Sequence, residues 1–322
     1  MRQYFLRRFL LALITIVGVL YFVFMFVRIA LPGSVARQII GDEGTYAEAD
    51  LRRLERELGL RGNALTFTRD FGVWLGGLPR GDLGTSYVSG RGVAQDLADK
   101  LPVTFEFGIL ALTIGVSLAL PLGVLAAVHR NRPADYLSRS WAALTLAVPD
   151  FWVALLIVAF AGQVRYFHWL VPSTYVRLID DPVRNLAGLA VPACILGVGI
   201  AGGLLRLTRA QMVDVLGRDY IRTAHAKGLH RNAVIYQHAF RNALIPVVTV
   251  IGLRVPMLVG GAVILESIFN IPGIGRFFVN AMGQRDFPVV QGVMALVAAT
   301  VVMANLVVDL AYAWMDPRIR YR

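Results

Sequence analysis

The sequence predicts an all-α polytopic membrane protein with six transmembrane helices, and three observations carry that prediction. Of its 322 residues, 57% are hydrophobic and 16% are charged, which is more apolar surface than a soluble core needs. Six apolar runs approach the roughly 20 residues with which a helix crosses a bilayer. The net charge of +11 lies in short basic runs beside these apolar runs, as membrane topology requires, so we predict lipid contact and no nucleic-acid partner.

The six predicted spans follow one another along the chain, separated by polar segments. They are Phe9–Val27, Val103–Val128, Ala142–Val164, Leu186–Leu205, Val247–Leu265 and Val289–Trp314. Basic residues precede the first span, follow the second and end the chain, so the positive-inside rule places both termini in the cytoplasm of a multi-pass inner membrane protein. The first run is longer than the apolar region of a signal peptide and no small-residue cleavage site follows it, which favours an uncleaved anchor.

The predicted organisation has an anchor, an outer subdomain, a core and a tail. These are residues 1–31, 32–101, 102–315 and 316–322, and the core contains a cytoplasmic loop at 206–241. In the exoplasmic subdomain, Tyr46–Gly59 predicts an amphipathic helix, because its leucines recur on one face among charges. Glycine-rich turns with aromatic residues follow, and then a second helical piece at Val93–Lys100. This subdomain either caps the first span or contacts a protein that delivers substrate.

Residues 206–241 are the most basic stretch of the chain, with seven Lys or Arg and two Asp. Tyr220–Lys227 contains no helix breaker and predicts a short helix. We expect Gly228 to end it at the C′ position with a positive φ, which glycine adopts without a Cβ penalty. A second helix is predicted over Arg231–Leu244. Two short helices hinged at a glycine beside the membrane indicate a docking device, with a plain connector as the alternative.

This stretch resembles the cytoplasmic loop of ABC-importer permease subunits, whose general pattern begins Glu-Ala-Ala and continues to a glycine and then Ile-x-Leu-Pro. Arg222, Thr223 and Ala224 stand at the Glu-Ala-Ala positions. Of the general pattern this chain keeps only the small Ala224, the glycine at Gly228 and the hydrophobic spacing.

The resemblance is closer to the oligopeptide/dipeptide/nickel branch of these permeases. That branch reads like YIRTARAKG and HALRNALIPV, and this chain reads YIRTAHAKG at 220–228 and HAFRNALIPV at 238–247. The motifs FNIPGIG at 269–275 and DPRIRY at 316–321 extend the resemblance over nearly the whole chain.

The resemblance implies a type I importer fold, in which a second, homologous permease encloses an alternating-access path with this one. Two cytoplasmic ATPase subunits would bind ATP and Mg²⁺ and grip the loop, while this chain would bind no cofactor. An extracytoplasmic substrate-binding protein would deliver the solute. Peptides, nickel, glutathione, sugars and opines stay open as the cargo. The implied coupling residues are Tyr220, Arg222, Thr223, Ala224, Ala226, Lys227 and Gly228.

The sequence contains no pattern of a catalytic or metal site. It has no G-x-x-x-x-G-K-[ST], no HExxH, no GxSxG and no zinc-spaced Cys/His cluster, so we do not predict an enzyme. With Cys194 as its single cysteine, the chain forms no internal disulfide. A self-sufficient secondary transporter or channel is the alternative function. It predicts internal repeats, and residues 1–160 and 161–322 show no convincing one.

Charged and helix-breaking residues in or near the spans are the candidates for the transport path, because a charge in hydrocarbon is expensive and usually purposeful. Pro149 removes a helix hydrogen bond and so predicts a kink lined by Asp150. For each charge, local pairing or contact with water is the alternative. The predicted path residues are Pro149, Asp150, Pro256 and Glu266, and the other charges in or near the spans are Glu106, Arg254 and Asp309.

Overall fold

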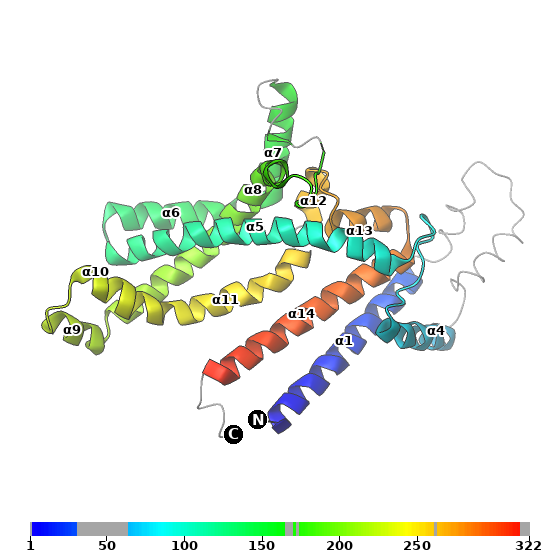
Figure 1. Ribbon diagram of the computed structural model, residues 1–322, viewed down its shortest axis with the longest axis horizontal. Helices are drawn as coiled ribbons and strands as arrows, with labels where there is room; N and C mark the ends of the chain where they lie inside the picture. The colour runs from blue at the N-terminus through cyan, green and yellow to red at the C-terminus, as the bar shows by residue number, and fades with distance from the viewer. Residues whose placement is uncertain (1, 31–63, 165–169, 172–173, 261–262, 316–322) are drawn as a thin grey trace, which may run out of the picture. The chain divides into compact units, whose positions relative to one another are not determined.

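The structure, a computed structural model, describes residues 2–30, 64–164, 170–171, 174–260 and 263–315. In these ranges the regular structure is helical, apart from one antiparallel β-bridge between Thr85 and Gly92 (Figure 1). The chain divides into two compact units, residues 1–102 with 273–322 and residues 103–272. The helix predicted at Tyr46–Gly59 lies outside the described residues.

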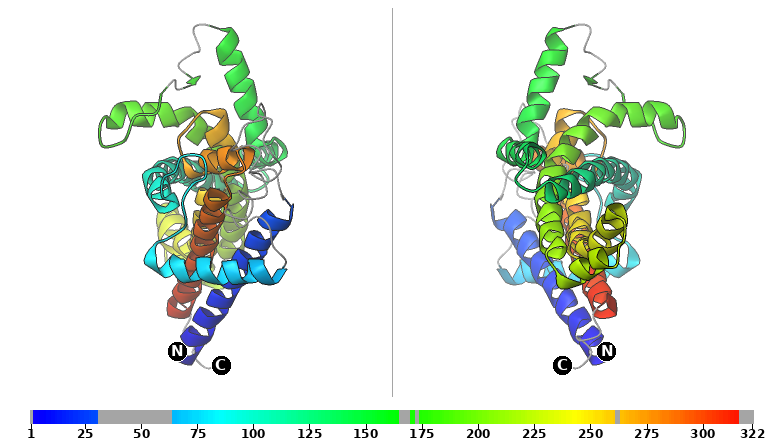
Figure 2. Two further views of the ribbon diagram at one scale, coloured as in Figure 1. Left: turned by 90° about the vertical axis from the view of Figure 1, so that its right-hand side faces the viewer. Right: turned by 90° about the vertical axis from the view of Figure 1, so that its left-hand side faces the viewer.

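The first unit is built on two long helices, α1 (Arg2–Ala30) and α14 (Phe287–Met315). They lie side by side and antiparallel, so the start of α1 and the end of α14 are at the same end of the pair (Figures 1 and 2). The predicted first and sixth spans fall inside them. A helix with apolar residues on all sides is the pattern of a membrane span.

A third helix of this unit, α4 (Ala64–Gly77), corrects the prediction of glycine-rich turns before residue 78. Its aromatic residues Phe67, Phe71 and Trp74 recur at helical spacing. Phe71 and Trp74 pack on Phe24 of α1, with ring centroids 5.4 Å and 5.8 Å away. Aromatic contact at these distances stabilises beyond area burial, so the packed stripe outweighs the poor helix propensity of the glycines.

Short elements complete the first unit around the start of α14. They are η1 (Leu78–Arg80), the beginning of α5 (Val93–Val128) and α13 (Ile274–Gly283). The buried Asp286 carboxylate accepts hydrogen bonds from the Ser86 hydroxyl and the Tyr87 backbone N–H. This contact fixes the loop before α5 onto the turn that leads into α14.

The second unit is organised around α8 (Pro182–Leu216), which contacts α6, α7, α11 and the π-helical segment η3. Its other elements are α6 (Pro133–Ala147), α7 (Asp150–Gln163), α9 (Asp219–Ala226), α10 (Arg231–Ala233), η3 (Val234–Phe240), α11 (Arg241–Gly260) and α12 (Val263–Ile268). The part of α5 from Val103 onward also belongs to this unit.

Glycines let α5 and α8 approach closely, as the glycine content of the fourth span predicted. A Cβ on Gly197 of α8 would lie 2.7 Å from the carbonyl oxygen of Ala111, and one on Gly123 of α5 would lie 2.7 Å from the Cβ of Thr208. Real Cβ atoms do not approach other atoms so closely. Small residues at helix crossings are the usual means of such contact in lipid.

Both α5 and α8 are longer than the predicted spans. At 36 and 35 residues they measure roughly 50 Å, against a hydrocarbon layer of about 30 Å. The predicted piece Val93–Lys100 is therefore the start of α5 itself. Residues 206–216, predicted as loop, continue α8, because polarity marks the exit from lipid while the helix ends only at Gly217.

The third predicted span is two helices. The break lies at Val148 and Pro149, where a kink was predicted, but α6 and α7 meet at 82°. Proline supplies no N–H to continue the ladder, and the residue before it avoids the α region. Among the described residues, five helices are long and apolar enough to cross a membrane, or six if α6 and α7 form one broken span.

The predicted boundary between the loop and the fifth span is absent. A helical run begins at Arg231, as predicted, but continues through η3 and α11 to Gly260 instead of ending at Leu244. Pro246 and Pro256 both lie within α11. The π-helical turns of η3 shift the hydrogen-bond ladder just before the first of these prolines.

Candidate coupling surface and transport path

The helix α9 is held to the second unit by two side chains on one face. Ile221 and Ala224 are 2% and 7% exposed, and the three-residue spacing puts them on the same side. They belong to one apolar cluster with residues from the ends of α5 and α8 and from η3: Val124, Ala127, Met212, Val215, Val234, Ile235 and Ala239. The sequence folds this way locally because α9 is short and strongly amphipathic.

Gly228 ends α9 as predicted, with a φ of +75°. Its N–H donates to the carbonyl of His225 at 3.0 Å, and the N–H of Leu229 donates to the carbonyl of Ala224 at 3.3 Å. These two bonds are those of a Schellman motif with Gly228 at C′. An added Cβ would meet no atom within 4 Å, so the requirement for glycine comes from the backbone conformation alone.

Six of the seven predicted coupling residues are exposed and one is buried. Ala224 faces the apolar cluster, while Tyr220, Arg222, Thr223, Ala226, Lys227 and Gly228 are open to solvent. The Tyr220 hydroxyl accepts a hydrogen bond from the Asn242 side chain at 3.2 Å, which connects α9 to the start of α11. The exposed face is polar and basic, and the chain behind it is firmly packed.

A buried ion pair between α6 and α8 escaped the sequence analysis. Arg209 donates from Nε and Nη2 to the two carboxylate oxygens of Asp135 at 2.6 Å and 2.7 Å, and the Asn131 N–H adds a third bond at 3.0 Å. Asp135 is fully buried. No sequence signal relates Asp135 to a partner 74 residues further along the chain.

Asp150, a predicted path residue, is half-buried at the first position of α7. Its carboxylate lies against Gly199 of α8, where an added Cβ would be 2.7 Å from Oδ2. Pro149 is exposed and caps α7 with an extended backbone. The break in the helix thus presents a carboxylate beside the glycine-rich side of α8.

Glu266, a predicted path residue, is buried, so the alternative that it contacts water at the membrane boundary does not hold. Its side chain is 0% exposed, and its Oε1 accepts a hydrogen bond from the Thr104 hydroxyl at 2.7 Å. A buried carboxylate needs such partners, since an unpaired charge in a low dielectric is costly. Glu266 therefore binds α12 to α5.

Glu106 has a partner set that the sequence did not show. Its Oε2 accepts from the Tyr175 hydroxyl at 2.6 Å and from the Asn185 amide at 3.2 Å. Burial and then the hydrogen bond to Glu106 raise the pKa of Tyr175 above its ordinary value, so the phenol stays protonated and donates at physiological pH. This contact joins α5, α8 and the loop before α8.

The remaining candidates lie on the long helices α11 and α14. Pro256 lies in α11, and Arg254 is half-buried one turn or less before it on the side of Gly203. Asp309 lies in α14, and no side-chain contact of it is described. Across the described residues, no three His, Cys, Asp or Glu side chains gather as a metal site would require.

Comparison with known proteins gives consistent matches. The family model described as "Binding-protein-dependent transport system inner membrane component" matches residues 119–321. A Brucella abortus chain named for a peptide transport system is 40% identical over 95% of this chain and 94% of its own length. The dipeptide transport system permease protein DppB of Escherichia coli is 36% identical, and the oligopeptide transport system permease protein AppB of Bacillus subtilis is 34% identical, each over 100% of both chains.

Proposed function

The chain belongs to the family of inner membrane components of binding-protein-dependent transport systems, and from this premise we propose that it carries short peptides. It is a multi-pass permease subunit of an ABC importer without an ATPase site of its own. This assignment does not fit the alternative of a self-sufficient secondary transporter. Similar chains named for peptide, dipeptide and oligopeptide transport support a peptide cargo.

The proposed assembly contains four kinds of chain. This permease pairs with a second, homologous one, two cytoplasmic ATPase subunits bind ATP and Mg²⁺, and an extracytoplasmic binding protein delivers the peptide. Its support is the family itself and the absence of a phosphate-binding loop from the sequence. Energy from ATP must then reach the spans through a contact surface on this chain.

We propose that α9 is that surface, and one observation carries the proposal. The face of α9 that carries Ile221 and Ala224 is buried in the same cluster as the ends of α5 and α8, while its polar face is open. A push on the open face would move α9 and these two helix ends as one body, since packed interiors transmit displacement.

The proposed path runs past the break between α6 and α7. The half-buried Asp150 carboxylate is a fitting partner for the ammonium group of a peptide, and Pro149 keeps the helix broken beside it. Pro256 stays proposed as a flexible point in α11. Glu266 would serve the path indirectly, because its hydrogen bond with Thr104 holds α12 on α5.

The proposed orientation places both termini in the cytoplasm, and cysteine labelling tests it. Asp180 and His230 are both exposed and lie on opposite sides in this topology. With Cys194→Ser as background, an impermeant maleimide added to intact cells should label Asp180→Cys and leave His230→Cys unlabelled until the cells are opened. The reverse pattern at both sites contradicts the topology.

Substitution of Gly228 tests the coupling role. Gly228→Val forces a β-branched residue to a positive φ at a cost of roughly 1–2 kcal/mol. The Schellman hydrogen bonds at the end of α9 should then break, and the orientation of α9 should change. We expect an inserted subunit with peptide uptake reduced at least about tenfold. Gly228→Asn is the matched control, because asparagine tolerates the left-handed region and should keep most uptake. Wild-type uptake and normal co-purification of the ATPase subunits with Gly228→Val would refute the proposal.

A further inference from the structure

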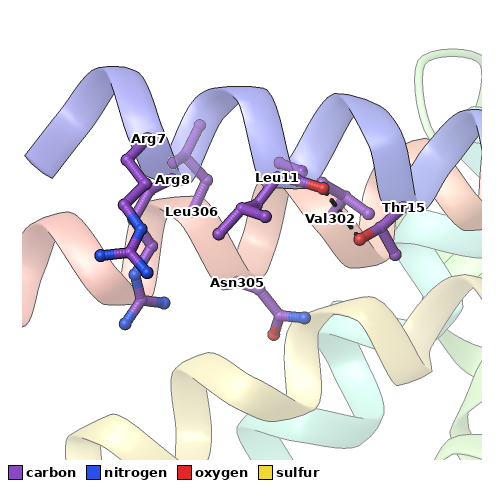
Figure 3. A pocket seen from close by; sticks show the side chains of 8 residues that line it. Arg7, Arg8, Leu11, Thr15, Val302, Asn305 and Leu306 are labelled. Atoms are coloured by element: carbon purple, nitrogen blue, oxygen red, sulfur yellow. Dashed lines mark hydrogen bonds between the residues drawn. The ribbon is translucent and has the colours of Figure 1, made fainter.

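A groove of about 500 Å³ lies between α1 and α14 of the first unit, toward the start of α1 and the end of α14 (Figure 3). Arg7 and Arg8 line it near the start of α1. Further along, its walls are apolar and come from Leu11 on α1 and from Val302 and Leu306 on α14. The groove therefore changes from cationic to apolar along its length.

The polar groups of the groove share one direction. In the view of Figure 3 the guanidinium groups of Arg7 and Arg8 and the amide of Asn305 all point to the same side. The Thr15 hydroxyl, which also lines the groove, donates to the carbonyl of Leu11 at 2.9 Å. Because that bond uses the hydroxyl proton, Thr15 does not donate to a ligand in the groove. The groups that can bind a polar ligand are therefore mainly at the end lined by Arg7 and Arg8.

The arginines lie at the depth of lipid headgroups. Between Arg8 and Arg28 the sequence of α1 has no charged residue over Phe9–Val27, and these roughly 19 residues at 1.5 Å each span about 28 Å, which matches the hydrocarbon thickness of about 30 Å. Arg7 and Arg8 therefore stand at one boundary of the hydrocarbon layer. Asn305 and Leu306 of α14 line the groove together with Arg7 and Arg8, so this part of α14 lies at the same level.

We propose that this groove binds one anionic phospholipid from the leaflet on the N-terminal side. Arg7 and Arg8 would contact the headgroup phosphate, to which the Asn305 amide adds a hydrogen-bond donor, and an acyl chain would lie along Leu11, Val302 and Leu306. Two cations beside an apolar channel complement an anionic lipid in both charge and polarity.

The exposure of α1 favours lipid over a protein helix as the occupant. Leu10, Leu11 and Ile14 are 49%, 52% and 66% exposed, and only 17% of the most apolar window of the helix is buried. Apolar side chains open on several sides are what a helix presents to acyl chains. A protein partner would be expected to need a single continuous face.

Native mass spectrometry of the intact importer tests the proposal with phosphatidylglycerol and phosphatidylcholine as probes. Phosphatidylglycerol should bind at least about fivefold more tightly, and Arg7→Gln with Arg8→Gln should weaken it about 10- to 30-fold, given roughly fivefold for each basic residue near an anionic surface. Arg7→Lys with Arg8→Lys, which keeps the charge, should retain binding within a few-fold. Arg130→Gln with Arg132→Gln removes two other exposed cations and should change nothing.

Three results would overturn the inference. Equal binding of the two lipids, or equal losses in the Arg7/Arg8 and Arg130/Arg132 variants, would show that the groove does not select an anionic headgroup. Equal competition by soluble glycerol phosphate would show that the apolar walls contribute nothing and that the ligand is a free phosphate. High-yield cross-linking of Leu11→Cys to the second permease, in the Cys194→Ser background, would show that protein fills the groove.

Discussion

The helix α8 contributes one member to each of two arginine–aspartate pairs, of which one has a buried carboxylate and the other is exposed to solvent. Arg209 reaches across to α6, and its Asp135 partner is fully buried, with three hydrogen bonds to the carboxylate. Arg218 follows α8 and pairs with Asp214 at 2.6 Å, but both side chains are about 60% exposed. The first pair joins two helices that are far apart in sequence, whereas the second connects residues four apart on the surface.

This difference separates the scaffold of the second unit from its contact surface. In a low dielectric, removing one member of a buried pair strands the other charge, whereas exposed pairs are screened by water. The α6–α8 contact is therefore expected to be rigid. The surface around α9 is held instead by apolar side chains, and its charges, including the exposed Arg222–Asp219 pair at 3.4 Å, stay open to solvent.

The largest effect should come from Asp135→Asn, which removes the carboxylate that binds Arg209. We expect a loss of about 3 kcal/mol of folding free energy, at the low end for a buried pair, because Arg209 is partly exposed and can reach water. Thermal melting of the purified transporter in detergent measures it. Asp214→Asn is the matched control and should melt close to wild type. Equal shifts for both variants would remove the distinction between the two pairs.

A smaller loss of stability is expected at Gly123, where α5 and α8 are held by close packing and not by an ion pair. Gly123→Ala places a Cβ 2.7 Å from the Thr208 Cβ and 3.1 Å from the Leu205 carbonyl, and overpacking of this kind costs about 1–3 kcal/mol. Gly72→Ala in α4 is the control, since its Cβ would meet nothing within 4 Å. The same melting experiment should show Gly123→Ala below Gly72→Ala, and the opposite order would contradict the close α5–α8 contact.

The smallest effect on stability belongs to the exposed face of α9. Arg222→Ala and Lys227→Ala should each change folding free energy by about 0–1 kcal/mol, because exposed charges contribute little. Peptide uptake should fall modestly in each variant and by less than in Gly228→Val, which misdirects the whole helix. If either single change abolished uptake while the melting temperature stayed normal, a single charge would be essential for the coupling contact, and the orientation of α9 would contribute little.

Local signals in the sequence predicted the membrane-spanning runs and the short helix α9. Six apolar runs, and the basic residues beside them, required only bilayer thickness and loop charge to interpret. Gly228 was predicted at a positive φ because its reason is local, a helix end with no Cβ penalty, and the structure confirms a φ of +75°. The start of the second loop helix at Arg231 was likewise readable, since the chain just before it breaks one helix and begins another.

Tertiary structure alone decided which polar groups meet and where the long helices stop. Asp135 finds Arg209, and Glu266 finds Thr104, across separations of 74 and 162 residues, and no pattern of period 2 or 3.6 encodes such a pairing. Packing also made a helix of residues 64–77 and carried α8 to Leu216, because burial of one apolar face outweighs intrinsic propensity. The sequence by itself determined that this chain crosses a membrane and contains a basic segment with a short helix that ends at Gly228, whereas the three-dimensional packing of helices decided how that segment is held.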